Sequence, residues 1–391
     1  MSHLIEYIFF ITMFILIIFY IIYYSICYIY KNKQTKKFNI VEYNKMNKPK
    51  ISFIIPVYNE NSVLNKKFKN LCEIKYPKDK FEIIFVDGGS TDGTTDTINK
   101  YINSVDLDVK LIEQGKRMGF NNAVIDGFSK STGDIIFIPG AETIYSPDVL
   151  ELMIPYFSDQ RVGAVNGRQI IINLDEGISP KHEHAYRSMQ DFIRSGEDKI
   201  DTLFDVKGEI VAGRRNICSK LINNKVFINK GCIDACLFFQ SRMDGYLTHY
   251  EPKAVYYESS PPNFKDSFKQ RLRRAATLIQ NMLIFKNMIF NRRYGLFGML
   301  IMPAHLLMLS ILPYIFILDS FLLLILNIIL FPNYNYALIL IFNIIILISS
   351  RKLQTFVKLQ IVLVIANLKL LFGTETQKFE KIDSTRTNMI E

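Results

Sequence analysis

The sequence predicts an α/β protein in which a doubly wound, mostly parallel β-sheet is flanked by transmembrane helices. Between residues 50 and 262, short apolar runs alternate with stretches of helical periodicity, as expected for parallel strands joined by crossover helices. Two strongly apolar regions, residues 4–30 and 295–373, lie on either side of this mixed, charged stretch. The chain of 391 residues therefore has room for one soluble domain of about 200 to 250 residues together with membrane segments.

The first apolar region, residues 4–30, is expected to be a membrane anchor that the protein keeps. Its only charge is Glu6, it exceeds the roughly 20 apolar residues that cross a bilayer, and it lacks the small-residue cleavage site of a secretory signal. Four lysines follow it: Lys31, Lys33, Lys36 and Lys37. Because basic residues beside a span favour the cytosol, we expect an integral membrane protein with a cytosolic soluble domain, at the plasma membrane in a prokaryote.

The charge pattern favours a membrane partner, and no nucleic-acid partner is expected. The formal net charge is +10, and the basic residues concentrate beside the apolar segments, in residues 31–50 and 265–293. Anionic lipid headgroups explain that placement better than a nucleic-acid backbone does.

The elements of the soluble domain, residues 50–262, follow one another in a regular order. The expected strands are residues 51–57, 81–86, 109–113 and 135–138, and the expected helices are residues 62–71, 94–102 and 121–131. Ligands of such sheets bind beyond the carboxyl ends of the strands, so the loops that follow the strands are the expected site.

These loops carry unusual residues. PVYNE (56–60) follows the first strand, VDGGSTDGT (86–94) the second, KRMGFNNA (116–123) the third and PGAET (139–143) the fourth. In the second loop, glycines let the backbone approach a ligand, and Asp87 can accept a hydrogen bond from a nucleobase. The alternative for this loop alone is an ordinary turn that caps the next helix.

Taken in this order, the four loops resemble family 2 glycosyltransferases, an inverting group with a GT-A fold. The resemblance covers roughly residues 50–275 and implies a UDP- or GDP-sugar donor. It implies that the nucleotide sugar is bound by Pro56, Tyr58, Glu60, Asp87 and Ala141, with Lys116 or Arg117 facing the diphosphate. A cation there suits the chemistry, because it stabilises the leaving charge.

The resemblance also implies a divalent metal ion, Mg²⁺ or Mn²⁺. The family's Asp-x-Asp motif aligns with IIFIPGAETIYSP, so that Gly140 replaces the first acid and Glu142 the second. One carboxylate remains as a metal ligand, and both ions keep waters and phosphate oxygens as further ligands. The alternative is that Glu142 is a surface acid after a Pro-Gly turn.

The catalytic base is expected at Asp234. Residues 208–215 (GEIVAGRR) loosely match the family segment on the acceptor side, and residues 245–255 match its "GY…PxAxV" tail. Register from that tail places Asp234 on the base that takes the proton of the acceptor hydroxyl, with Ile233 where a companion acid usually stands. A helix N-cap is the alternative role for Asp234.

Residues 270–274 (QRLRR) resemble the QxxRW signature of membrane polysaccharide synthases, with Arg274 in place of Trp. The resemblance implies an acceptor-side or gating role for Gln270, Arg273 and Arg274. Apolar residues recur at helical spacing across residues 263–290, which predicts an amphipathic helix on the cytosolic membrane face.

The second apolar region, residues 295–373, is expected to form transmembrane helices. Spans are expected at residues 295–317 and 321–349, and residues 353–372 form either a third span or an interfacial helix. We favour the span, which gives four crossings in total, followed by a polar tail at residues 374–391.

The predicted function is transfer of a sugar from a nucleotide sugar to a polyprenyl-type lipid or glycan acceptor with inversion. Two alternatives stay open: a polysaccharide synthase, and a catalytically degenerate protein that only binds nucleotide sugar.

Overall fold

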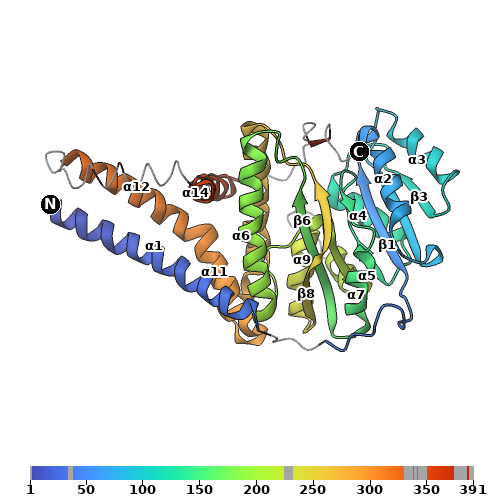
Figure 1. Ribbon diagram of the computed structural model, residues 1–391, viewed down its shortest axis with the longest axis horizontal. Helices are drawn as coiled ribbons and strands as arrows, with labels where there is room; N and C mark the ends of the chain where they lie inside the picture. Colours follow the sequence, from blue (N-terminus) through green and yellow to red (C-terminus); the bar gives the residue numbers. More distant parts are fainter. Residues whose placement is uncertain are drawn as a thin grey trace.

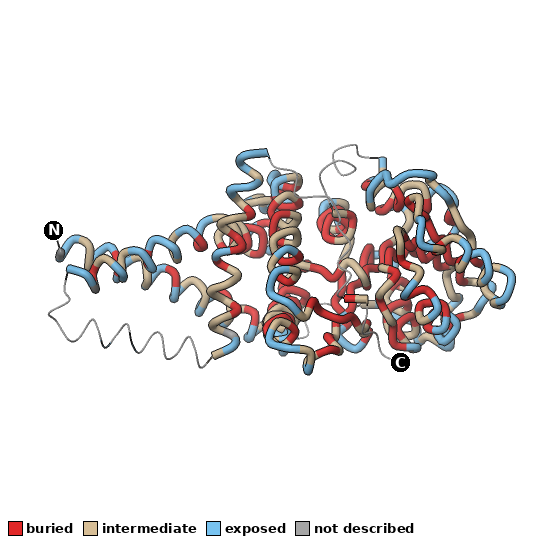
Figure 2. Tube along the Cα trace, turned by 90° about the horizontal axis from the view of Figure 1, so that it is seen from above, coloured by how far each residue is buried: buried red, intermediate tan, exposed pale blue. Residues whose placement is uncertain are grey.

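The structure is a computed structural model that describes residues 2–33, 38–223, 232–329, 338, 341, 350–373, 385 and 386. An α/β body holds most of the buried residues, and long helices extend from one side of it (Figures 1 and 2).

The body contains an eight-stranded sheet in the order β3-β2-β1-β4-β7-β6-β8-β5. The strands are β1 (Ile51–Val57), β2 (Phe81–Asp87), β3 (Asp108–Glu113), β4 (Ile135–Phe137), β5 (Ile144–Tyr145), β6 (Val162–Ile171), β7 (Val211–Arg214) and β8 (Leu247–Glu258). The first four are mutually parallel, as predicted. Strand β7 runs antiparallel to both of its neighbours, so the complete sheet is mixed.

Helices cover both faces of the sheet because successive apolar residues of each strand point to opposite sides. Phe53 and Ile55 pack in one core with helices α2 (Asn61–Glu73), α3 (Thr94–Ile102) and α5 (Val149–Met153). Ile54, which lies between them, packs in the other core. That second core is formed with helices α4 (Phe120–Lys130), α7 (Arg215–Ile222) and α9 (Ile233–Met243).

A second group of helices joins the body to the apolar segments. It consists of α1 (Ser2–Lys31), α6 (Ile178–Ile200), α10 (Phe264–Ile284), α11 (Met302–Leu306), α12 (Leu312–Ile329) and α14 (Arg351–Leu371). Within the described residues, three helices are long and apolar enough to cross a membrane: His3–Lys31, Phe297–Leu326 and Leu353–Leu371. Figure 1 shows α1 and α12 extending away from the body, with α6 between them and the sheet.

Helix α1 is fastened to this layer by a buried carboxylate. Glu197 of α6 accepts a hydrogen bond from the Tyr23 hydroxyl (2.6 Å), and His305 Nε2 lies 2.6 Å from the same oxygen. Gly196 lies directly against Cys27, since a Cβ atom added to this glycine would come within 2.6 Å of the Cys27 Cα. The first apolar helix is therefore an integral part of the fold.

Two membrane predictions need correction. The expected spans at 295–317 and 321–349 are not separated at residues 318–320, because α12 runs through them without a break; most of residues 330–349 lies outside the described part. The amphipathic helix expected over 263–290 ends at Ile284, and its apolar face packs against α14: Ala275 and Ile279 are buried against Val362. Protein, not lipid, covers this part of the predicted membrane-facing surface.

Helix α14 also crosses the direction of α1 and α12. It is seen nearly end-on in Figure 1, where α1 and α12 lie along the page, and it packs against α10 and α6. Its apolar composition satisfies the requirement for a span, and it runs across the direction of the other two candidate spans.

Candidate active site

The predicted loops meet at one edge of the sheet. Strands β1 and β2 end side by side, with Val57 opposite Asp87, and β4 continues this edge on the other side of β1. The Asp87 side chain is turned into its own loop: its Oδ2 accepts hydrogen bonds from the backbone N–H groups of Gly89 and Ser90, both at 2.9 Å. The structure thus shows the turn-capping role, and contact with a nucleobase stays a prediction.

The predicted nucleoside and diphosphate residues lie next to one another. The Arg117 guanidinium stacks over the Tyr58 ring, 4.5 Å from its centroid. Gly89 has a φ of +82°, and a Cβ atom there would lie 3.1 Å from the Cα of Lys116, so the second and third loops are in close contact. Lys116 and Arg117 are both exposed at this edge, and the structure does not choose between them as the diphosphate ligand. Pro56, at the end of β1, is half-buried there.

Glu60 and Glu142, predicted from different loops, are bridged by a residue that the sequence did not suggest. The Arg386 guanidinium donates to both oxygens of Glu60 at 2.7 and 3.0 Å, and to Glu142 Oε1 at 3.2 Å. All three side chains are largely buried. A cation is thus held between the expected nucleoside pocket and the expected metal ligand. No pattern around Arg386 distinguishes it from other basic residues of a polar tail, so sequence reasoning missed it.

A second carboxylate stands beside Glu142, and it comes from a different part of the chain. Glu209 Oε2 accepts a hydrogen bond from the backbone N–H of Gly140 at 2.5 Å. A Cβ atom added to Gly140 would lie 2.5 Å from Glu209 Oε2 and 2.7 Å from Glu142 Oε2. The space next to Glu142, where the family's first acid would begin, is therefore occupied by Glu209, which explains why residue 140 is a glycine.

The two carboxylates of Glu142 and Glu209 repel each other, and a buried lysine lies nearby. Burial, followed by the negative charge of Glu142, raises the pKa of Glu209 to about 8. Behind them, Lys67 is fully buried and donates to the Thr143 carbonyl at 2.8 Å, and burial lowers the pKa of this lysine to about 7. A bound cation would relieve the repulsion between Glu142 and Glu209.

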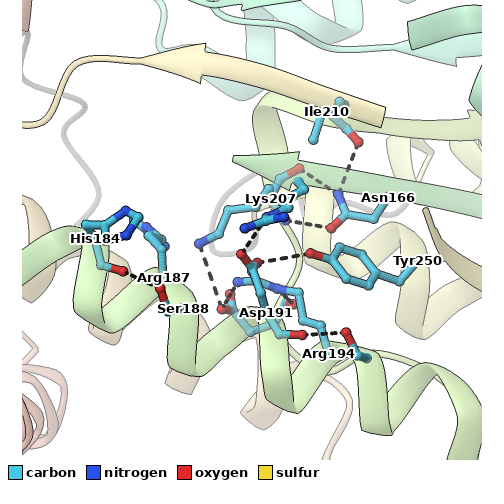
Figure 3. A network of polar contacts seen from close by, with 12 residues as sticks. Asn166, His184, Arg187, Ser188, Asp191, Arg194, Lys207, Ile210 and Tyr250 are labelled. Carbon is cyan, nitrogen blue, oxygen red and sulfur yellow. Dashed lines mark hydrogen bonds and ion pairs between the residues drawn. The ribbon is translucent and has the colours of Figure 1, made fainter. Parts of the chain in front are cut away.

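The backbone on either side of Glu209 is held by hydrogen bonds from strand β6. The Asn166 side chain donates to the carbonyls of Lys207 (2.8 Å) and Ile210 (3.1 Å), and its Oδ1 accepts from Lys207 N. Figure 3 shows these bonds within a larger network, in which Asp191 of α6 accepts from Tyr250 of β8. These hydrogen bonds fix the position of the backbone that carries Glu209. The weak GEIVAGRR match was the only sequence signal for this segment.

Asp234, the predicted base, lies in the first turn of α9 and faces the same region. Its Oδ1 accepts a hydrogen bond from Ala235 N at 2.7 Å, and its other oxygen lies against Gly208, where a Cβ atom would come within 2.1 Å of it. Its charge also contributes to the raised pKa of Glu209. Burial raises the pKa of Asp234 itself above the usual aspartate value. A side chain at position 208 would displace this carboxylate.

The QRLRR residues of α10 differ in their surroundings. Arg274 lies 3.2 Å from Glu183 and 4.0 Å from Glu258, and Gln270 is buried. Burial, followed by the charge of Arg274, lowers the pKa of Arg273, and the charges of Glu209 and Glu142 act in the opposite direction. Arg273 is thus the residue of this motif that lies within electrostatic reach of both candidate metal ligands. The acceptor-side or gating role of the three remains a prediction.

The residues present fit a divalent ion that has only two protein ligands, the carboxylates of Glu142 and Glu209. Among the described residues, no group of three His, Cys, Asp or Glu side chains could hold a metal. Two carboxylates, Glu142 and Glu209, converge beside Gly140. Mg²⁺ and Mn²⁺ bind through one or two carboxylates when substrate phosphates and waters complete the shell, so this pair suits an ion that enters with the donor.

Comparison with known proteins defines the class. Residues 52–222 match the model of "Glycosyl transferase family 2", which supports the resemblance to this glycosyltransferase family over that part of the chain. It is 29% identical to "Probable glycosyltransferase YdaM" of Bacillus subtilis over 58% of this chain and 54% of that protein. It is 24% identical to "Beta-monoglucosyldiacylglycerol synthase" of Nostoc over 48% of this chain and 37% of that protein. The chain therefore spans about half the length, or less, of these curated relatives.

A solved structure confirms the GT-A-type fold. The mannosyltransferase PcManGT from Pyrobaculum calidifontis, solved in complex with GDP-Man and Mn²⁺, superposes with a TM-score of 0.80. The match covers 95% of this chain and 100% of that one at 22% identity. At this identity the likeness shows the fold, and the roles of individual residues must be argued from their own geometry.

The Arg386 bridge leads to a prediction for metal binding. Replacing Arg386 by Gln removes a cation that neutralises Glu142, so we expect Mn²⁺ to bind roughly fivefold more tightly to R386Q. Electron paramagnetic resonance of free Mn²⁺, titrated with the detergent-purified protein, measures this affinity without turnover. R386K, which keeps the charge, is the matched control and should stay close to wild type. Weaker Mn²⁺ binding by R386Q would contradict the prediction.

Proposed function

We propose that this protein transfers a sugar from a UDP- or GDP-sugar to an acceptor at the cytosolic membrane surface, with inversion at the anomeric carbon. One observation carries the proposal: the carboxylates of Glu142 and Glu209, from separate parts of the chain, converge beside Gly140, and Asp234 lies against Gly208, the residue before Glu209. Acids assembled in this way suit both the holding of a metal–diphosphate and the removal of a proton.

Asp234 would act as the general base. It accepts the proton of the acceptor hydroxyl while that oxygen forms a bond to the anomeric carbon, and the bond from this carbon to the diphosphate oxygen breaks on the opposite face. The nucleoside diphosphate leaves with the bonding electrons. The raised pKa of Asp234 makes it a stronger base than an exposed aspartate once it is ionised.

The donor would lie between the two groups of loops. Tyr58 and Glu60 face the nucleoside, Asp87 and Ala141 line the same edge, and Lys116 or Arg117 reaches the diphosphate. Glu142 and Glu209 would hold Mg²⁺ or Mn²⁺, which neutralises the charge that develops on the leaving diphosphate. Support for a metal comes from the facing carboxylates and from the GT-A neighbour solved with Mn²⁺.

The acceptor would be lipid-linked and reached from the membrane. Helices α1 and Phe297–Leu326 would cross the bilayer, and α14 would lie along its surface, because α14 runs across the other two. This arrangement would hold the body against the headgroup layer, which is where a polyprenyl-type or glycolipid acceptor exposes its hydroxyl or phosphate group. The relative named for a glucosylated diacylglycerol product is in keeping with such an acceptor.

Turnover with defined donors tests the proposal. The purified full chain is incubated with UDP- and GDP-sugars, Mn²⁺ or Mg²⁺ and a membrane lipid extract, and the nucleoside diphosphate and the glycosylated product are measured. We expect release of nucleoside diphosphate that depends on the metal, together with a product bearing one or a few sugars. A long polymer from a single donor would favour a polysaccharide synthase. Nucleotide binding without turnover for any donor would favour a degenerate binding protein.

A further inference from the structure

A cavity lies at the junction of the body and the apolar helices, away from the candidate active site. It is formed by the beginnings of α6 and α10 and by the middle of α14, and it is a small, open depression with a cavity volume of about 20 Å³. Its polar lining includes His182, Arg271 and Lys358, and its apolar lining includes Phe264 and Phe268. None of the described residues that line it is acidic.

The positive charge of the cavity is only partly balanced. Arg271 is nine-tenths buried, and one of its terminal nitrogens, Nη2, lies 3.0 Å from Glu183 without forming a hydrogen bond to any described residue. Glu183 is shared with Arg187 and Arg274, so one carboxylate serves three guanidinium groups. Lys358 Nζ lies over the Phe264 ring, 5.7 Å from its centroid. An anion in this cavity would meet two cationic side chains, Lys358 and Arg271, and Arg271 is at the same time paired with Glu183.

The backbone adds to this positive potential. Both α6 and α10 begin at the cavity, with Ser179 and Ser267 in their first turns lining it. The first N–H groups of a helix carry partial positive charge and point away from the helix body, which favours an anion at this position. The start of α6 and two basic side chains therefore lie at one opening, whereas the start of α10 is already capped by the Asn263 side chain, which accepts from Asp266 N.

Two exposed apolar side chains lie at or beside the cavity: Phe264 lines it, and Ile178 precedes the lining residue Ser179. Ile178 and Phe264, the first residues of the two helices, have exposed fractions of 71% and 62%. Helix α14, which forms one wall, is among the helices apolar enough for a membrane. Figure 1 shows α14 and α6 between the sheet and the extended helices. A charged cavity rimmed by exposed apolar side chains matches a ligand with an anionic head and hydrocarbon tails.

We propose that this cavity binds the phosphate group of an anionic phospholipid from the surrounding bilayer, with Lys358 and Arg271 contacting the phosphate and Phe264 and Ile178 entering the acyl region. The inference rests on the membrane placement proposed above. A free phosphate ester has no hydrocarbon tails that could contact the exposed side chains of Phe264 and Ile178. We therefore favour a phospholipid over a free phosphate ester as the ligand.

A short series of ion pairs leads from the cavity toward the body. Arg271 pairs with Glu183, Glu183 with Arg274, and Arg274 approaches Glu258. The series ends at Glu258, whose negative charge contributes to the raised pKa of Glu209.

Lipid binding is tested on the full chain in detergent, without any nucleotide sugar. The delipidated protein is titrated with short-chain phosphatidylglycerol, and native mass spectrometry counts the bound lipid. We expect saturable binding of one phosphatidylglycerol, with binding to short-chain phosphatidylcholine at least roughly fivefold weaker. Glycerol 3-phosphate and inorganic phosphate, which lack the tails, should bind still more weakly. Equal binding of phosphatidylcholine, or tighter binding of inorganic phosphate, would overturn the proposal.

The matched variants lie on one helix. K358Q should weaken phosphatidylglycerol binding roughly fivefold, whereas K358R, which keeps the positive charge, should bind as tightly as wild type. K369Q, which removes an exposed lysine near the end of α14 and outside the cavity, should bind as wild type does. Lys358 makes a better test than Arg271, whose loss would also disturb the pairing of Glu183. If K358Q binds like wild type, or if K369Q loses as much, the cavity is not the site. Because the donor is absent, either outcome is independent of the transfer assay.

Discussion

Replacing Asp234 by Asn should lower kcat by roughly 10²- to 10⁴-fold while leaving the affinity for the donor nearly unchanged. Asn keeps the shape of the side chain and can still accept the hydrogen bond from Ala235 N, but it cannot take a proton. Steady-state kinetics with the donor identified in the turnover assay, together with equilibrium binding of the same donor, separate the two effects. Asp244→Asn, at the other end of α9, is the matched control and should retain activity.

The pH dependence of this reaction follows from the same residue. Burial raises the pKa of Asp234, and only the ionised carboxylate can act as a base. Activity should therefore rise with pH through an apparent pKa above that of an ordinary aspartate, and this acid limb should be missing from the residual activity of D234N. If D234N retains wild-type kcat, or keeps the same acid limb, Asp234 is not the base.

Replacing Glu209 by Gln should be almost as damaging as replacing Glu142, although only Glu142 occupies a position of the family's metal motif. Each change removes one of the two carboxylates beside Gly140, so we expect Mn²⁺ affinity to fall by at least about tenfold and kcat/KM at fixed metal by about 100-fold. Mn²⁺ titration by electron paramagnetic resonance gives the affinity without turnover.

A control and a rescue sharpen this test. Glu113→Gln removes an exposed carboxylate at the end of β3, on the same edge of the sheet, and should have little effect. The double change G140D/E209A restores an acid at position 140 after making room for it, and should recover part of the metal affinity lost in E209A. Wild-type Mn²⁺ affinity in E209Q would show that Glu209 only positions Gly140 through its backbone hydrogen bond.

The order of the first four strands and the loops that carry Tyr58, Asp87 and Glu142 could be predicted from sequence. Each of these depends on neighbouring residues: a buried parallel strand is a continuous apolar run, and a loop beyond its carboxyl end is rich in glycine and polar residues. Strands β5 to β8 were not predicted in detail because their pairing joins distant segments of the chain. Gly163 and Gly167 also lie where β6 shifts its register against β8, and added Cβ atoms there would collide with neighbouring groups.

The less predictable part of the site is made by contacts across the sequence. Glu209 substitutes in space for a residue missing at position 140, and no local pattern marks an acid that acts 69 residues away. Arg386 reaches Glu60 across 326 residues for a similar reason. The helix boundary was misplaced at 318–320 because Asp319 and Ser320 interrupt the apolar run, whereas in the structure Asp319 accepts a hydrogen bond from Thr12 of α1 and the helix continues.

The hydrogen bonds between Tyr23, Glu197 and His305 limit whether helix α1 can be exchanged or removed. An anchor that served only as a tether could be exchanged for another apolar helix or removed to release a soluble catalyst. Here the anchor supplies the hydroxyl that satisfies Glu197 and the surface that receives Gly196, so its removal would leave an acid and an imidazole facing an open groove. Recombination between relatives should therefore preserve α1 and α6 as an inherited pair, and swapping either one alone should yield a protein that fails to assemble.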